Sequence, residues 1–381
     1  MNYTHPQIRR IAQRIPILCA SYFAVFSFFY LYVFERDILA QTQFRLSEGT
    51  TVYHPFLAAF LCTLLLTFLG LFIGRLFHWL PLRLKASAWF LPFLLVGALT
   101  HWRYPEYGDT GTAPGWGTVA LLLSAYVLWL FISRLWTDSS KERESSFAYA
   151  WPNGLQLIAF TVMCVCLSNT NIMLHRTLYA ARQLSEGRYD QVLQAAQWEQ
   201  HPSRQLSAMT ALALSENNLL GEYLFAYPQP HGSEGLLPTM SDTLMCYDLP
   251  RAAGYHLGYK RGQCTSSTFF LKVIANMPKA QPAVRDYLLC AYLLDRNLEA
   301  FTAELGADAQ EPDSLPRHYG EALVLYRHTQ TESLSEELVT PLDSCFHLFQ
   351  ELLHEKGTQA EREFNLRHRF GASYWTYYYF N

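Results

Sequence analysis

The chain has 381 residues, of which 50% are hydrophobic and 16% are charged, and its formal net charge at pH 7 is −3. Residues up to Asn171 carry 12 Lys and Arg against 8 Asp and Glu, whereas those from Ile172 onward carry 17 against 24. A mildly acidic second half argues against nucleic acid as a partner and against a polybasic lipid-binding surface in that half.

Five apolar stretches without Asp, Glu, Lys or Arg dominate the first half. About 20 such residues span a bilayer core as a helix, because a helix satisfies its own backbone hydrogen bonds where lipid offers none. The third stretch is the weakest, since it is short and contains Pro92, and a re-entrant third segment would move the soluble half to the cytoplasm. The predicted transmembrane domain covers residues 1–174, with spans at 15–34, 55–74, 86–102, 115–133 and 151–174.

The loops between these stretches alternate in charge, with nine Lys and Arg on one side and three on the other. The positive-inside rule makes the nine-residue side cytoplasmic. The N-terminus is then cytoplasmic, and five crossings place residues 175–381 outside, in the periplasm of a Gram-negative bacterium. The first stretch lacks a small-residue cleavage site, so we expect a retained span. The predicted location is a bacterial inner membrane.

The best candidate for chemistry is the acidic pair Glu35 and Asp37, directly after the first span. Polytopic glycosyltransferases that use lipid-linked sugar donors carry an acidic pair in their first external loop, which binds a metal or activates the acceptor. The residues that could complete such a site are Arg36, His54, Glu106 and Asp109. The simpler interpretation is that charges at a span end stop insertion and solvate the interface.

Residues 175–381 have the pattern of short amphipathic helices in pairs. A helix at 174–184, a turn at Gly187 and a helix at 191–198 are closed by Pro202. Similar pairs follow at 206–214 with 219–225, and at 284–294 with 298–305. Units that each bury little apolar surface are expected to stack into a solenoid. The predicted fold class is all-α, with a bundle of five transmembrane helices followed by a soluble α-solenoid.

The first of these pairs resembles a tetratricopeptide repeat. The residues that carry the resemblance are Gly187, Tyr189, Asp190, Val192, Ala195, Ala196 and Pro202. The closing proline comes early and later units lack the turn glycine, so the repeats are degenerate. The resemblance implies a scaffold whose concave face binds a peptide or protein partner, although repeat folds have many roles.

Both halves also resemble an uncharacterised membrane family, associated with Bacteroidetes, that has a helical-repeat C-terminus. The segments that carry this resemblance are 34–40, 46–49, 53–55, 315–326 and 369–380. The resemblance implies the architecture and a Gram-negative origin, and it brings no established activity.

Six of the seven residues at positions 374–380 are aromatic. As a last helix they would cap the open end of the solenoid, because a terminal repeat must close its apolar face. As a strand they would dock on a partner or lie on the membrane surface, since aromatic rings dominate interface energetics. The candidate binding residues are Tyr374, Trp375, Tyr377, Tyr378 and Tyr379.

Four cysteines of the second half, Cys246, Cys264, Cys290 and Cys345, would lie in an oxidising compartment and permit three full pairings. If a bridge forms, we favour Cys246 with Cys264, which closes the irregular region where a repeat core is thinnest. The alternative is that all four are reduced and buried in helices.

The sequence contains no glycine-rich phosphate loop, no Gly-x-Ser-x-Gly elbow and no His-Glu-x-x-His zinc helix. We therefore predict no cofactor and no metal site. The favoured function is an interaction scaffold that contacts membrane lipid and presents its periplasmic domain to a protein or peptide, with no nucleic-acid partner. The alternative is a glycosyltransferase-like enzyme that uses Glu35 and Asp37.

Overall fold

The computed structural model describes residues 6–102, 104, 116–135, 146–239, 247–261, 266–306, 315–330, 340–355 and 358–381. Within these ranges the chain is all-α and contains no strand, so the predicted all-α class is confirmed. The chain divides into two compact units, Met1–His175 and Arg176–Asn381.

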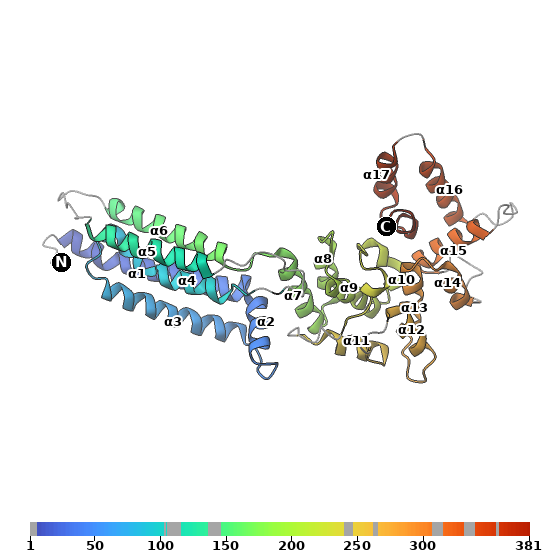
Figure 1. Cartoon of the computed structure of the whole chain (residues 1–381), viewed down its shortest axis with the longest axis horizontal. Coiled ribbons are helices and arrows are strands. Elements are labelled where there is room, and N and C mark those ends of the chain that lie inside the picture. The colour runs from blue at the N-terminus through green and yellow to red at the C-terminus, as the bar shows by residue number, and fades with distance from the viewer. Residues whose placement is uncertain are drawn as a thin grey trace. The chain divides into compact units, whose positions relative to one another are not determined.

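The first unit is a bundle of long helices, several of which run side by side in Figure 1. A π-helical turn at Tyr30–Phe34 follows α1, and a 3₁₀ segment at Leu82–Trp89 precedes α4. The helices are α1 (Pro6–Phe29), α2 (Arg36–Leu46), α3 (Pro55–Leu76), α4 (Phe90–Leu99), α5 (Trp116–Leu135) and α6 (Ser146–Leu167).

Among the described residues of this unit, four helical segments are long and apolar enough to cross a membrane: Arg10–Phe34, Pro55–Leu76, Leu82–Leu99 and Phe147–Leu167. They indicate a membrane protein. The predicted fourth span falls on α5, where the apolar helical stretch Gly117–Ile132 is shorter than these four.

The third segment is held by side chains of α6. Asn153 Nδ2 donates to the carbonyl of Leu82 (2.8 Å), and the backbone N–H of Ala86 donates to Asn153 Oδ1 (2.7 Å). Ser87 Oγ donates to Gln156 Oε1 at 2.7 Å. Irregular backbone at membrane depth is tolerated where protein groups satisfy it, and these amides do so.

The expected fifth span at 151–174 is not one helix. The helix α6 ends at Leu167, and α7 (Ile172–Ser185) begins after a short break. Asn171 Oδ1 accepts from the backbone N–H groups of Met173 (3.0 Å) and Leu174 (3.3 Å), so this side chain starts a new helix. A prediction from apolar composition alone does not take the capping side chain of Asn171 into account.

The second unit consists of shorter helices, many at positions that the sequence predicts. Neighbouring helices pack as pairs, among them α8 with α9, α12 with α13, α13 with α14, and α16 with α17. The centre of the unit is α13, where Leu288–Leu294 are buried. The bounds are α8 (Tyr189–Gln197), α9 (Arg204–Glu216), α10 (Leu220–Tyr223), α11 (Leu249–Leu257), α12 (Ser267–Ala275), α13 (Ala283–Leu294), α14 (Leu298–Leu305), α15 (Arg317–Gln330), α16 (Pro341–Leu353), α17 (Gln359–Phe370) and α18 (Tyr374–Phe380).

Candidate functional site

The acidic pair lies at a break between two helices of the first unit. The π-helical turn ends at Phe34, Glu35 adopts φ −100° and ψ 8°, and α2 begins at Arg36. Single π-turns are rare in proteins, and those that occur often lie at functional sites. The exposed fractions of Glu35 and Asp37 are 3% and 9%. Both carboxyl groups therefore belong to the packed interior of this unit.

Glu35 faces the end of α6. Its carboxyl group is hydrogen-bonded to Tyr30, whose hydroxyl also lies 2.6 Å from Ser168 Oγ. Its Oε2 atom is buried and has no hydrogen-bond partner within the described part of the chain. Burial raises the pKa of Glu35 to about 7, because low-dielectric surroundings disfavour the charged form, while the Tyr30 hydrogen bond lowers it in part. Such a group can take up a proton near neutral pH.

Asp37 lies on α2, where Gln41 is also buried. The hydroxyl of Thr42 on the same helix lies 2.7 Å from the hydroxyl of Tyr104, and the Arg45 guanidinium lies 5.3 Å from the centre of the Tyr104 ring. These contacts fix α2 against the segment that follows α4, and they hold the acidic pair in place.

Tyr53 completes the surroundings of the pair. Its hydroxyl is buried without a hydrogen-bond partner in the described residues, and it interacts electrostatically with Arg36 and Asp37. His54 is exposed at the start of α3, and Glu106 and Asp109 lie outside the described residues. Sequence reasoning missed Tyr30, Tyr53 and Ser168 as neighbours of the acidic pair. The sequence contained one indication for Tyr53, since this residue lies in a segment that resembles the uncharacterised family.

The ends of α4 and α6 form a second polar layer. His101 Nδ1 lies 3.0 Å from the carbonyl oxygen of Leu167, and the N–H of Asn169 donates to the carbonyl of Thr100 at 3.0 Å. His175 Nε2 lies 2.9 Å from the carbonyl oxygen of Asn169. These groups satisfy backbone atoms that helix ends leave without partners. We interpret this layer as structural.

In the second unit, the aromatic run forms α18. Tyr374, Trp375 and Tyr377 are buried in the core, Tyr378 is half-buried, and Tyr379 is 41% exposed. The Trp375 ring packs against Phe346 and Phe349 with centroid distances of 5.1 and 5.8 Å. Three of the five candidate binding residues thus have the environment of a capping helix.

Glu321 on α15 holds this helix. Its Oε2 atom accepts from the backbone N–H of Tyr374 (2.7 Å) and lies 3.0 Å from His318 Nδ1, while Oε1 accepts from Arg317 Nε (2.9 Å). Trp375 Nε1 donates to the backbone carbonyl of Glu321 at 2.8 Å. Glu321 is 2% exposed. The network joins two of the segments that resemble the uncharacterised family.

A cleft of about 600 Å³ opens beside α18. Its walls come from the segment after α8, from the loop after α10 and from the last two helices. None of its lining residues in the described part of the chain is acidic, and Arg367 and His201 contribute positive or titratable nitrogen. The other lining residues include Gln200, Tyr227, Pro228, Gln229, Thr376, Tyr377 and Asn381.

The repeat signature lies in the turn between α7 and α8. Gly187 has φ +69°, a conformation that favours glycine. Tyr189 and Asp190 begin α8, Ala196 is buried on it, and Pro202 is buried before α9. Gly187 therefore forms the turn between these two helices, and the tetratricopeptide likeness stays a prediction.

The favoured disulfide partners, Cys246 and Cys264, lie outside the described residues. Cys290 is a buried free thiol whose sulfur lies 3.5 Å from the Tyr319 hydroxyl, and Cys345 is free and exposed. No group of three His, Cys, Asp or Glu residues in the described ranges could hold a metal ion.

The chain belongs to the family of unknown function DUF6057, whose model matches residues 20–269 and 261–381. Both units are covered by the match, so the expected membership of an uncharacterised family is confirmed. No curated protein and no solved structure matches the chain.

Proposed function

We propose that this member of DUF6057 is a membrane-anchored interaction scaffold. Residues 1–174 form five transmembrane helices with the N-terminus in the cytoplasm of a Gram-negative bacterium. Residues 175–381 form a tetratricopeptide-like domain in the periplasm, which binds a protein or peptide. Four long apolar helices and the alternating loop charges support the membrane part. Paired helices and the Gly187 turn support the repeat part.

The cleft beside α18 carries this proposal. Residues from Ile172 onward contain 24 acidic against 17 basic side chains, yet no described residue of the cleft lining is acidic. Arg367 donates from Nε to Glu363, an ion pair that offsets part of its charge, and from Nη2 to the carbonyl of Phe380. These bonds fix its guanidinium at the cleft. Charge complementarity therefore favours an extended peptide that carries a carboxylate.

Photocrosslinking in living cells tests the scaffold. A photoreactive residue at His201, which is exposed in the cleft lining, is expected to give a reproducible crosslinked band. Arg367→Gln should weaken this band at least fivefold, while Arg369→Gln, at an exposed arginine outside the lining, should preserve it. The control position for the photoreactive residue is His354, which is exposed and lies outside the cleft lining. Equal bands from positions 201 and 354, or no band from 201, would reject the scaffold.

A second candidate function is a glycosyltransferase-like membrane enzyme. The observation in its favour is the buried Glu35, whose Oε2 atom has no partner among the described residues and which lies two positions before the buried Asp37 in the sequence. A buried carboxyl with a raised pKa suits general acid or base chemistry. The scaffold proposal does not use this group.

Complementation of a deletion strain separates the two functions. We expect Glu35→Gln and Asp37→Asn to restore the wild-type phenotype, and Arg367→Gln to fail, when all variants accumulate in the membrane at equal levels. Glu48→Gln, at an exposed acid of the same segment, is the control. If both acidic-pair variants fail while Arg367→Gln complements, the enzyme replaces the scaffold.

A further inference from the structure

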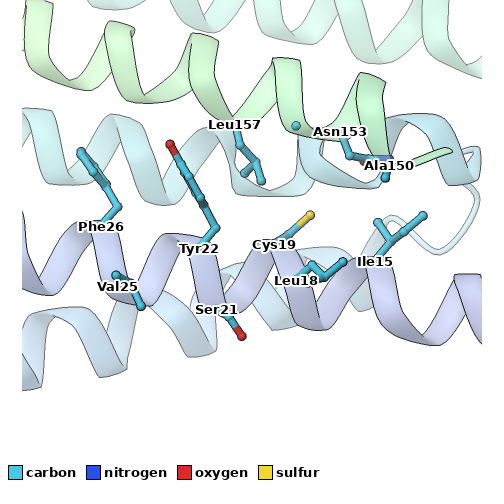
Figure 2. A pocket seen from close by; sticks show the side chains of 11 residues that line it. Ile15, Leu18, Cys19, Ser21, Tyr22, Val25, Phe26, Ala150, Asn153 and Leu157 are labelled. Carbon is cyan, nitrogen blue, oxygen red and sulfur yellow. The ribbon is translucent and has the colours of Figure 1, made fainter. Parts of the chain in front are cut away.

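An apolar groove of about 690 Å³ lies between α1 and α6 in the first unit. Figure 2 shows Phe26, Tyr22 and Cys19 of α1 pointing toward α6, and Leu157 of α6 pointing toward α1, while Ser21 points away from α6. The lining residues are Ile15, Leu18, Cys19, Ser21, Tyr22, Val25, Phe26, Ala150, Asn153, Gly154 and Leu157. Both helices are long and apolar enough to span a membrane, so the groove opens toward hydrocarbon.

The groove has the length of one lipid leaflet. From Ile15 to Phe26 the helix α1 rises about 16 Å at about 1.5 Å per residue. The hydrocarbon core of a bilayer is about 30 Å thick, so one leaflet is about 15 Å deep. An acyl chain lying along α1 would fill the groove from end to end.

Two polar side chains of the groove wall, Asn153 and Tyr22, are already bonded within the protein. Asn153 is hydrogen-bonded to Leu82, Ala86 and Tyr149. The hydroxyl of Tyr22 lies 3.1 Å from Thr161 Oγ1. A Cβ atom added at Gly154 would meet no described atom within 4 Å, so the space beside it is open. The wall therefore offers an occupant mainly apolar contact.

Two arginines lie at one end of the groove. Arg10 and Arg14 are exposed, and the positions 10, 14, 18, 22 and 25 follow one another at helical spacing. They therefore lie on one face of α1, which carries two guanidinium groups before it becomes apolar. Arginine pairs well with phosphate oxygens, and basic groups near the membrane surface attract anionic lipid.

We propose that this groove binds one anionic phospholipid of the bilayer, with an acyl chain along α1 and α6 and its phosphate at Arg10 and Arg14. A second copy of the chain is the less suitable occupant. Two copies in one membrane share their orientation, and a symmetric contact through this face would bring both arginine pairs together. Two arginine pairs that are brought close together repel each other, whereas a lipid phosphate neutralises their charge.

Native mass spectrometry of the full chain in detergent tests the lipid site, with phosphatidylglycerol and phosphatidylcholine as probes. The wild-type chain is expected to retain one phosphatidylglycerol and to prefer it over phosphatidylcholine. The double variant Arg10→Gln/Arg14→Gln should lose at least tenfold in phosphatidylglycerol binding and lose the preference. Arg75→Gln, at an exposed arginine of α3, is the matched control and should keep both.

A variant of the groove itself provides the second arm. Gly154→Leu should reduce retention of both lipids at least fivefold, because its side chain occupies the open space. Gly117→Leu on α5, where an added Cβ likewise meets no described atom within 4 Å, should retain both. The proposal is overturned if Arg10→Gln/Arg14→Gln or Gly154→Leu retains as much phosphatidylglycerol as the wild-type chain. It is also overturned by a dimer that Gly154→Leu dissociates, since the groove would then hold a second copy.

Discussion

Replacing Glu321 by alanine is expected to lower the free energy of unfolding of the second unit by about 3 kcal/mol, because it breaks a buried charged network. The carboxylate accepts from the N–H of Tyr374 and from Arg317 Nε, and it lies 3.0 Å from His318 Nδ1. Its removal leaves buried donors without partners. Denaturant unfolding of the full chain in detergent, followed by tryptophan emission, to which the buried Trp375 is one of nine contributors, measures the change.

The matched control is Glu363→Ala. Glu363 Oε1 accepts from Arg367 Nε at 2.8 Å, but the side chains of Arg367 and Glu363 are 44% and 37% exposed on α17. Exposed ion pairs contribute about 1 kcal/mol or less, so the unfolding midpoint should barely change. If Glu321→Ala unfolds at the same denaturant concentration as Glu363→Ala, the docking of α18 does not depend on the carboxylate.

The helices of the second unit could be predicted because their ends carry local signals. Asn297, for example, separates α13 from α14, and its side chain accepts from the N–H of Ala300 at 3.0 Å. Gly187 likewise ends a helix with a positive φ. Signals of this kind depend on residues within one helical turn, and a single sequence contains them in full.

The irregular parts of the first unit could not be predicted in the same way. The 3₁₀ segment at Leu82–Trp89 depends on Asn153, which is about 70 residues away and contacts Leu82 and Ala86. Hydropathy alone predicts one span at 151–174, although the capping side chain of Asn171 separates two helices there. Composition measures how apolar a segment is, and it does not report which side chains compete for the backbone.

The candidate site shows the same limit. The position of Glu35 and Asp37 after the first span was evident in the sequence, but their burial was not. Burial follows from the packing of Glu35 near Tyr30 and Ser168, residues 138 positions apart in the chain. The aromatic run allowed both a cap and a binding segment, and Glu321 on a separate helix bonds to its first residue.

Glu35 leads to a pH-dependent prediction for the first unit. Burial of the carboxyl raises its pKa from the ordinary value of 4.5 to about 7 in the folded protein. The folded chain therefore binds this proton more tightly than the unfolded chain. The contribution of Glu35 to stability is highest below pH 4.5 and falls as the pH rises through the window from 4.5 to 7. The total loss attributable to Glu35 is about 3 kcal/mol.

Glu35→Gln removes this titration. The variant should match the wild-type chain at about pH 4 and exceed it by about 3 kcal/mol at about pH 8, as measured by detergent-solubilised unfolding across this range. Glu48→Gln, at an exposed acid, should show no such difference. A bound cation would reverse the sign, because it stabilises the carboxylate, and Glu35→Gln would then be the less stable protein at about pH 8. The sign of the difference at about pH 8 thus decides whether the ionised carboxyl is buried without a counter-charge or is paired with a bound cation.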